Sequence, residues 1–145
     1  MKPPTVRLSF PAQSGYLTLA RTAVRALCAR LDFPIDRLDD TTLAVSEACT
    51  LLLADACEGS VIDLRLTAET GDGLLIEATT RTVRGRPPRQ NSFTWTVLTA
   101  LVDSVDATAD AGLVTIRLRT NPTDSADPTD PATCDPRTHS GAAQT

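Results

Sequence analysis

The hydrophobic and polar positions of the first 120 residues follow two different periods. Alternation with a period of two predicts strands at 5–10, 61–67, 74–80 and 113–119, and a short strand at 105–107. Apolar residues spaced three and four apart predict helices at about 14–30, 40–57 and 92–102. This order of elements predicts an α+β fold, a two-layer sandwich in which helices cover one face of a mixed, mostly antiparallel sheet.

Residues that favour helix starts stand near the beginning of each predicted helix. Ser14 is placed to cap the first helix, Asp39 or Asp40 the second, and Ser92 the third. The segment 81–91, between a strand and the third helix, holds two prolines, one glycine and four arginines. This composition predicts a loop.

The predicted helix 40–57 is apolar on two sides. One side carries Val45, Ala48, Cys49, Leu52 and Ala56, and the other carries Leu43, Glu47, Thr50, Leu51 and Ala54. Such a helix needs cover on both faces. Glu47 is a carboxylate among leucines, where burial is costly unless the charge is paired. It is either a glutamate at a partly wet edge with an arginine partner or a functional group.

Composition predicts one globular domain followed by a tail. The chain has 145 residues, 41% of them hydrophobic and 22% charged, which is ordinary for a globular protein with a core. We place the domain at 1–120. Residues 121–145 lack large apolar side chains and are rich in Asp, Pro and Thr, so we expect this acidic tail to be disordered.

Charge and hydropathy argue against two classes of binding partner, nucleic acids and membranes. The net charge is −4, and the tail contributes −3 of it, so residues 1–120 have no basic excess and no direct nucleic-acid partner is expected. Arginines 81, 84, 86 and 89 form a cluster that is more simply a solvated loop than a phosphate-contacting patch. Neither an apolar run of membrane-spanning length nor a secretory signal is visible, so we expect a cytoplasmic protein without a membrane partner.

The four cysteines do not indicate a metal site. They stand at 28, 49, 57 and 134 without a Cys-x-x-Cys pair, and the single histidine is His139 in the tail. Cys49 and Cys57 would lie about 12 Å apart along one helix, too far to bridge. We expect buried, reduced thiols and no bound metal.

Four segments resemble one protein family. They are Arg7-Leu8-Ser9-Phe10-Pro11-Ala12, Leu19-Ala20-Arg21, Val45-Ser46-Glu47-Ala48-Cys49-Thr50, and the run from Phe93 to Leu101. In this order they resemble RsbW-type anti-sigma factors of the histidine-kinase-like ATPase superfamily, and the last run most resembles the mycobacterial branch. The resemblance covers about residues 5–119 and implies the fold of that superfamily with a shortened ATP lid.

The resemblance also shows where the family's ATP site has degenerated. Glu47 matches the family's activating glutamate, but Leu51 stands where an asparagine would hold Mg²⁺, a cation that requires oxygen ligands. Residues 76–82 lack the Asp that would recognise adenine and the glycines that would let the backbone approach the nucleotide. Residues 89–95 lack the glycines of a phosphate-binding turn. We therefore expect ATP and Mg²⁺ binding to be weak or absent, with no cofactor.

The implied function is that of an anti-sigma factor without kinase activity. It would sequester an alternative, stress or sporulation-type sigma factor as a homodimer, control transcription, and be released by an anti-anti-sigma factor. Arg21 and Thr50 resemble the family's contact positions, and we add Arg25 and the apolar Leu51 as partner-binding candidates. Plain solvation of Arg21 and Arg25 is an equally good interpretation.

Two other functions stay open. One is an active serine/threonine protein kinase that uses ATP to phosphorylate the anti-anti-sigma factor, with Glu47 as the catalytic base. The other is an unrelated small-ligand domain that shares the topology, since a fold alone does not fix a function.

Overall fold

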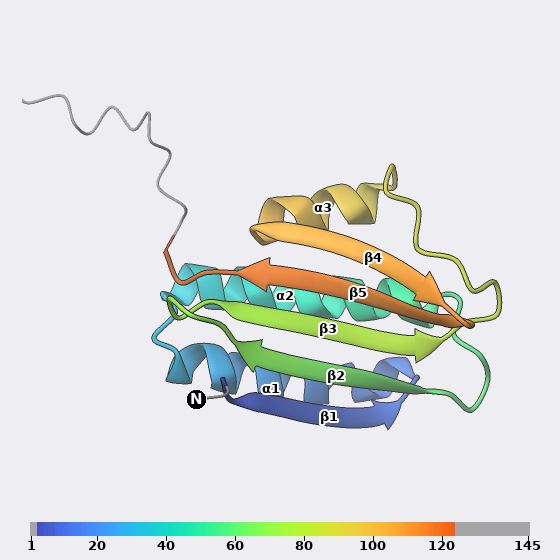
Figure 1. The fold of residues 1–145 in the computed structure, drawn as a ribbon, viewed down its shortest axis with the longest axis horizontal. Helices are drawn as coiled ribbons and strands as arrows, with labels where there is room; N and C mark the ends of the chain where they lie inside the picture. Colours follow the sequence, from blue (N-terminus) through green and yellow to red (C-terminus); the bar gives the residue numbers. More distant parts are fainter. Residues whose placement is uncertain (1–2, 124–145) are drawn as a thin grey trace, which may run out of the picture.

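The computed structural model describes residues 3–123, which form one five-stranded sheet and its covering helices (Figure 1). The strands are β1 (Thr5–Pro11), β2 (Val61–Ala68), β3 (Leu74–Arg81), β4 (Ser104–Asp110) and β5 (Leu113–Thr120). The helices are α1 (Leu17–Arg30), which follows a 3₁₀ turn at Ser14–Tyr16, α2 (Ile35–Leu53) and α3 (Phe93–Leu101). Apart from its first three residues, the tail 121–145 lies outside the described residues, so its predicted disorder stays a prediction.

The strand order is β1-β2-β3-β5-β4, and all four neighbouring pairs are antiparallel. The expectation of a mixed sheet is wrong in this respect. Between β1 and β2 the chain makes two helices instead of one, so it returns to the sheet in the opposite direction. The single-helix crossover from β3 through α3 to β4 does make two strands parallel, as such connections do, but β5 lies between them.

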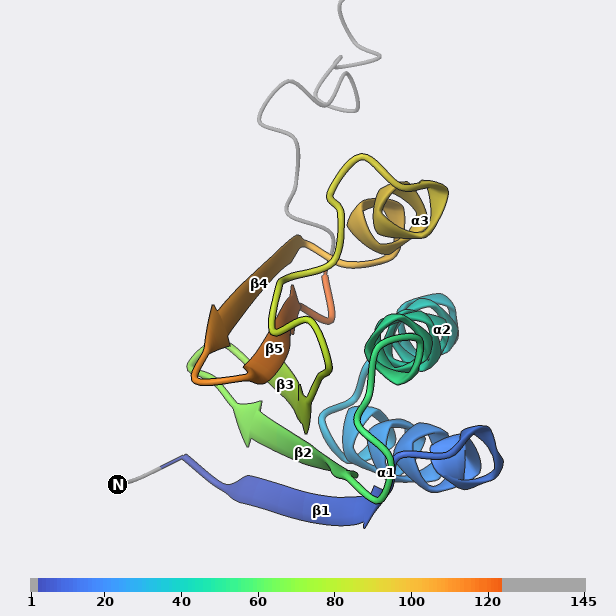
Figure 2. The same ribbon diagram turned by 90° about the vertical axis from the view of Figure 1, so that its right-hand side faces the viewer.

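All three helices lie on the same side of the sheet, and the other face is open (Figure 2). The alternation along β2, β3 and β5 places one set of side chains under the helices and exposes the other, which is the pattern expected of an antiparallel sheet with one solvated face. The core under α1 and α2 includes Leu52, Ile62, Leu64, Ile76 and Ile116. The predicted α+β sandwich is confirmed.

The predicted boundaries of α2 are wrong at both ends. The helix begins at Ile35, because Pro34 takes the N-cap position, where its fixed φ of −57° suits a helix start and its missing N–H costs nothing. Asp39 and Asp40 therefore lie inside the helix and do not cap it. At the other end α2 stops at Leu53, because the following backbone turns to pair Ala56 with Thr82 beside β3.

Of the other two predicted helix caps, one is confirmed and one is wrong. Ser92 caps α3 as predicted, with its Oγ accepting a hydrogen bond from the backbone N–H of Trp95 at 3.1 Å. Ser14 instead begins the 3₁₀ turn, and α1 starts at Leu17. Within residues 3–123, every helix is too short or too polar to cross a membrane.

Candidate functional site

Helices α1 and α2 run side by side (Figures 1 and 2), and the sequence-predicted Arg21 and Arg25 of α1 both contact α2. The helices are antiparallel, since Arg21 contacts Ser46 whereas Arg25, one turn later, contacts Asp39. Helical spacing puts Asp39, Leu43, Ser46 and Thr50 in one stripe along α2. We call the surface formed by Arg21, Arg25, Leu43, Ser46 and Thr50 the α1–α2 face.

Arg21 has a fixed orientation on this face. Its Nη1 donates a hydrogen bond to Ser46 Oγ at 2.9 Å, and its Nη2 donates to Thr18 Oγ1 at 3.2 Å. The residue is partly buried, so the guanidinium rests on the surface of α2 instead of extending into water. Free solvation, the alternative interpretation, does not describe this side chain.

Arg25 is held less tightly. Its Nη1 lies 2.8 Å from Asp39 Oδ1, and the two side chains are 48% and 57% exposed. An ion pair as open as this contributes little to stability, about 0–1 kcal/mol. Next to it Leu43 is 47% exposed, which leaves an apolar side chain uncovered between two charged groups. The α1–α2 face thus combines two cations with an exposed leucine.

Thr50 and Glu47 occupy the last turns of the same helix. Thr50 is exposed, and its Oγ1 donates back to the carbonyl of Ser46 at 2.8 Å, so its methyl group is left to face outward. Glu47 is half-buried, as expected of a residue at a partly wet edge. Within residues 3–123 its carboxylate has no hydrogen bond or ion pair, so an arginine partner is not found there.

Leu51 lies in a pocket at the C-terminal end of α2. The pocket has a volume of about 440 Å³ and lies between α2, the start of β5 and the segment 82–92, which we call the lid segment. Its lining residues come from all three: Leu51, Leu52, Ala54 and Asp55 from α2 and its end, Val114 from β5, and Thr82, Arg84, Arg86, Pro87, Pro88, Arg89 and Ser92 from the lid segment. We call this site the lid pocket.

A carboxylate fastens the lid segment to the end of α2. Asp55 Oδ1 accepts from Arg84 Nε at 3.0 Å, and Asp55 Oδ2 accepts from the backbone N–H of Arg84 at 3.2 Å. The sequence pattern did not predict this pair. A usable signal existed, because an acidic residue at the negative end of a helix dipole is unfavourable unless a cation compensates it.

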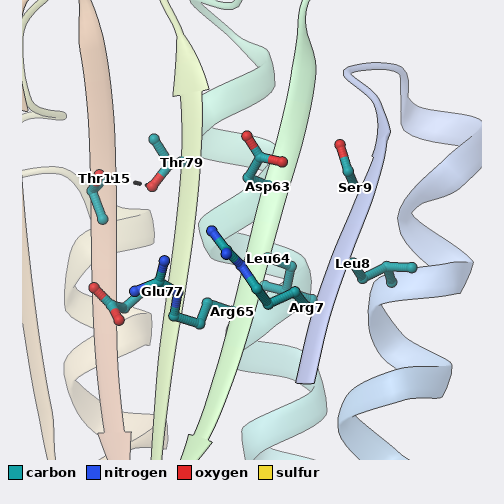
Figure 3. A pocket seen from close by; sticks show the side chains of 9 residues that line it. All are labelled: Arg7, Leu8, Ser9, Asp63, Leu64, Arg65, Glu77, Thr79 and Thr115. Atoms are coloured by element: carbon teal, nitrogen blue, oxygen red, sulfur yellow. Dashed lines mark hydrogen bonds between the residues drawn. The ribbon is translucent and has the colours of Figure 1, made fainter. Parts of the chain in front are cut away.

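A larger cavity, of about 500 Å³, lies on the open face of the sheet (Figure 3). Three of its lining side chains have polar partners: Thr79 and Thr115 share a hydrogen bond at 2.8 Å, and Glu77 lies 3.2 Å from Arg117, which is outside the lining. None of the sequence-predicted site residues lines it. We interpret this cavity as the solvated face of the sheet, and we give the smaller lid pocket more weight because Leu51 lines it.

Two of the predicted buried thiols lie in the core. Cys28 on α1 and Cys49 on α2 are both fully buried and unbonded, and burial raises the pKa of each to about 12. Cys57 is free and half-buried, and Cys134 lies outside the described residues. In residues 3–123 no group of three or more Asp, Glu, His or Cys side chains is arranged to hold a metal ion.

Comparison with known proteins identifies relatives. The chain is 34% identical over 100 residues to the anti-sigma-F factor RsbW of Mycobacterium tuberculosis, in strains CDC 1551 and H37Rv alike, covering 69% of this chain and 59% of the relative. The chain is related to RsbW-type anti-sigma factors. It is also 33% identical over 64 residues to a serine-protein kinase RsbW of Halalkalibacterium halodurans, covering 43% of this chain and 40% of that one.

The fold agrees with this RsbW kinship. A crystal structure of the RsbU and RsbW domains of Rv1364c from Mycobacterium tuberculosis aligns with a TM-score of 0.62 and 17% identity, over 81% of this chain and 32% of that one. The chain spans about three fifths of the length of the M. tuberculosis relatives. No protein-family model matches it.

The lid pocket does not fit the Mg²⁺ and ATP of an RsbW-type kinase. Leu51, which the resemblance matches to a metal-binding asparagine, lines the pocket and offers no oxygen to a hard cation. Asp55 is a carboxylate in the pocket, but both of its oxygens already accept hydrogen bonds from Arg84. Glu47, one turn before Leu51, is not among the lining residues. The lining residues of the pocket therefore offer Mg²⁺ no free carboxylate or amide oxygen.

Proposed function

We propose that this chain is an anti-sigma factor that binds and sequesters an alternative, stress or sporulation-type sigma factor, and so controls transcription without phosphoryl transfer. The observation that carries the proposal is the hydrogen bond between Arg21 and Ser46 at 2.9 Å. It holds the arginine at the family-like contact position in one orientation on the α1–α2 face. Kinship with proteins named anti-sigma-F factor RsbW supports the same function.

The composition of the α1–α2 face suits protein binding. Arginine is enriched among the residues that dominate binding energy at interfaces, and an arginine already immobilised loses less side-chain entropy when a partner arrives. Arg25 adds a second cation, while Leu43 and the methyl group of Thr50 offer apolar contact. A sigma-factor segment that carries acidic and apolar side chains would complement this face.

Sequestration requires only a surface, and this separates it from the kinase alternative. A kinase would need nucleotide and Mg²⁺ in the lid pocket, with Glu47 as base, because phosphoryl transfer depends on positioning and metal electrostatics. The one observation in favour of a kinase is the relative named serine-protein kinase RsbW. Leu51 argues against it, so we place the kinase second.

We include two further partners in the proposal. Like RsbW-type anti-sigma factors, the chain would act as a homodimer in the cytoplasm. An anti-anti-sigma factor would release it from the sigma factor. Neither partner requires direct contact with nucleic acid or membrane. Sedimentation equilibrium on the full chain tests the dimer, and a mass equal to one chain at micromolar concentration would contradict it.

The deciding experiment is capture of purified sigma factors by the full chain, followed by a dissociation constant for the one that binds. Arg21→Ala should weaken capture by about tenfold or more, the loss expected at an arginine hot spot. Arg30→Ala is the matched control, because Arg30 is an exposed arginine on α1 that lies outside the α1–α2 face. Equal affinity of the two variants, or no capture of any sigma factor from the host, contradicts the proposal.

Calorimetry with Mg²⁺ and ATP tests the kinase alternative in the same preparation. We expect no saturable heat at micromolar nucleotide. Saturable binding that is lost in Glu47→Ala, together with phosphate transfer to the anti-anti-sigma factor, would establish the kinase and overturn our assignment of the lid pocket.

A further inference from the structure

We propose that the lid pocket binds a medium-chain fatty acid, an aliphatic chain that ends in one carboxylate. This inference goes beyond sigma-factor binding and does not depend on it. Three properties of the pocket support it: an aliphatic interior, cations at its rim, and the absence of groups that recognise a nucleotide. Its volume, about 440 Å³, lies within the range of small-molecule sites.

The interior of the pocket is aliphatic. Leucines 51 and 52, Ala54, Val114 and prolines 87 and 88 line it, without an aromatic ring on which a flat base could stack. Leu51 is only partly buried, so part of its side chain stays exposed to the empty space of the pocket. Transfer of apolar surface out of water contributes about 25 cal/mol per Å², which favours a hydrocarbon occupant.

The lid segment brings positive charge to the rim. Arg84 is committed to Asp55, but the side chains of Arg86 and Arg89 are exposed and have no hydrogen bond or ion pair with the rest of the described chain. Because Asp55 is already paired with Arg84, the pocket has two uncompensated cations, Arg86 and Arg89, and no free anion. A guanidinium binds a carboxylate through two parallel hydrogen bonds, so an anionic head group is the complement of this rim.

Two hydroxyls of the pocket already accept hydrogen bonds from the backbone. Thr82 Oγ1 accepts from the backbone N–H of Gly85 at 3.0 Å, and Ser92 Oγ accepts from Trp95 N–H at 3.1 Å. The pocket lining has no amide side chain, and its one carboxylate is paired with Arg84, so no such group is free to bind a base or a sugar. The chemistry that the pocket leaves open is therefore one apolar body and one anionic end, which describes a fatty acid and not a nucleotide.

Decanoate is the probe, titrated into the full chain below its micelle concentration and followed by calorimetry. We expect saturable binding at one site per chain, and about tenfold or more weaker binding of decanol, which has the same chain without the charge. Decanoate brominated on its chain should quench Trp95, the single tryptophan, whose backbone N–H donates to Oγ of the pocket residue Ser92. Binding without quenching would place the ligand elsewhere and overturn the assignment.

The double variant Arg86→Gln with Arg89→Gln tests the rim. Both side chains are exposed, so the fold should be retained, and decanoate affinity should fall by about tenfold or more while decanol binding stays unchanged. Arg30→Gln, which removes one positive charge at an exposed position of α1 outside the lid pocket, should leave decanoate affinity unaltered. Equal binding of decanoate and decanol, an unaffected double variant, displacement by Mg²⁺ and ATP, or binding only to lipid vesicles would each overturn the proposal.

Discussion

Asp55 and Arg84, 29 residues apart, are joined by two hydrogen bonds that use both oxygens of one carboxylate. A third bond runs beside them, from the backbone N–H of Val83 to the carbonyl of Asp55 at 2.8 Å. The arginine side chain is 69% exposed, whereas that of Asp55 is only 19% exposed. The position of the lid segment therefore depends on a nearly buried acceptor at the end of α2.

Replacing that acceptor should loosen the lid segment. Asp55→Ala leaves the backbone N–H of Arg84 without its acceptor, and we expect a loss of about 1–2 kcal/mol in the free energy of unfolding. The exposed guanidinium adds little to this. Thermal melting measures the loss, and faster hydrogen exchange within residues 83–92 locates it. Asp39→Ala, which breaks only the open pair with Arg25, is the control and should cost less than about 0.5 kcal/mol.

Arg37 should be the most sensitive arginine in the described chain. Its Nη2 lies 3.0 Å from Asp103 Oδ2, and its Nε donates to the carbonyl of Asn121 at 3.1 Å, which fastens the start of α2 to the end of β5. The side chains of Arg37 and Asp103 are 14% and 24% exposed. Arg37→Met removes the cation beside a largely buried carboxylate, which keeps only its hydrogen bonds from Asn121, so we expect denaturant unfolding to show a loss of about 1–3 kcal/mol.

Two companion variants decide whether the geometry of Arg37 matters. Arg37→Lys should recover only part of the loss, because one ammonium cannot reproduce the planar fork that reaches Asp103 and Asn121 together. Arg25→Met, at an ion pair that is about half exposed, should be nearly neutral. A fully stable Arg37→Met protein would show that this network does not support the fold.

Local periodicity predicted most of the fold, because each strand and helix displays its own pattern. The strands β2, β3 and β5 were predicted from alternation with a period of two, and their burial alternates in the structure. The errors at the ends of α2 have another origin. Its start depends on the tolerance of a helix for Pro34, and its end on the pairing of Ala56 with Thr82, a contact between distant segments that no local pattern contains.

The features of the candidate site also separate into those that depend on one local segment and those that depend on the tertiary fold. The position of Leu51 on α2 could be predicted to line a pocket mouth, since it depends on one helix and a resemblance. The bond between Arg21 and Ser46 and the pairing of Asp55 with Arg84 could not, because each joins segments whose approach is set by the tertiary fold. Arg86 and Arg89 were predicted to be solvated, and their place at the rim of the lid pocket emerged only from the folded lid segment.

The turn between β4 and β5 should be a place to gain stability. Ala111 has a φ of 50° and Gly112 a φ of 82°, as a two-residue hairpin turn with both φ values positive requires. Alanine in this region is strained by about 1–2 kcal/mol, so Ala111→Gly or Ala111→Asn should raise the melting temperature by several degrees. Gly112→Ala is the opposing variant, because its Cβ would lie 3.2 Å from Arg81 Nη1 at an unfavourable φ, and it should lower the melting temperature.

The buried thiols should make the protein sensitive to alkali. The ordinary pKa of a cysteine is 9.0, and burial raises the pKa of Cys28 and Cys49 to about 12. Below pH 9 both thiols are protonated in the folded and unfolded chains, so their protonation does not favour unfolding. As pH rises from 9 towards 12 the unfolded chain loses these protons and the folded chain keeps them, so stability falls by up to about 1.4 kcal/mol per pH unit for each thiol.

Denaturant unfolding measured at successive pH values tests this linkage. Cys49→Ala costs some packing at neutral pH but removes one titrating thiol, so its stability should decline less steeply between pH 9 and 11 than that of the unsubstituted protein. Cys28→Ala, at the other fully buried thiol, should flatten the slope in the same way. An identical alkaline slope in all three proteins would show that the ionisation of Cys49 is not linked to unfolding.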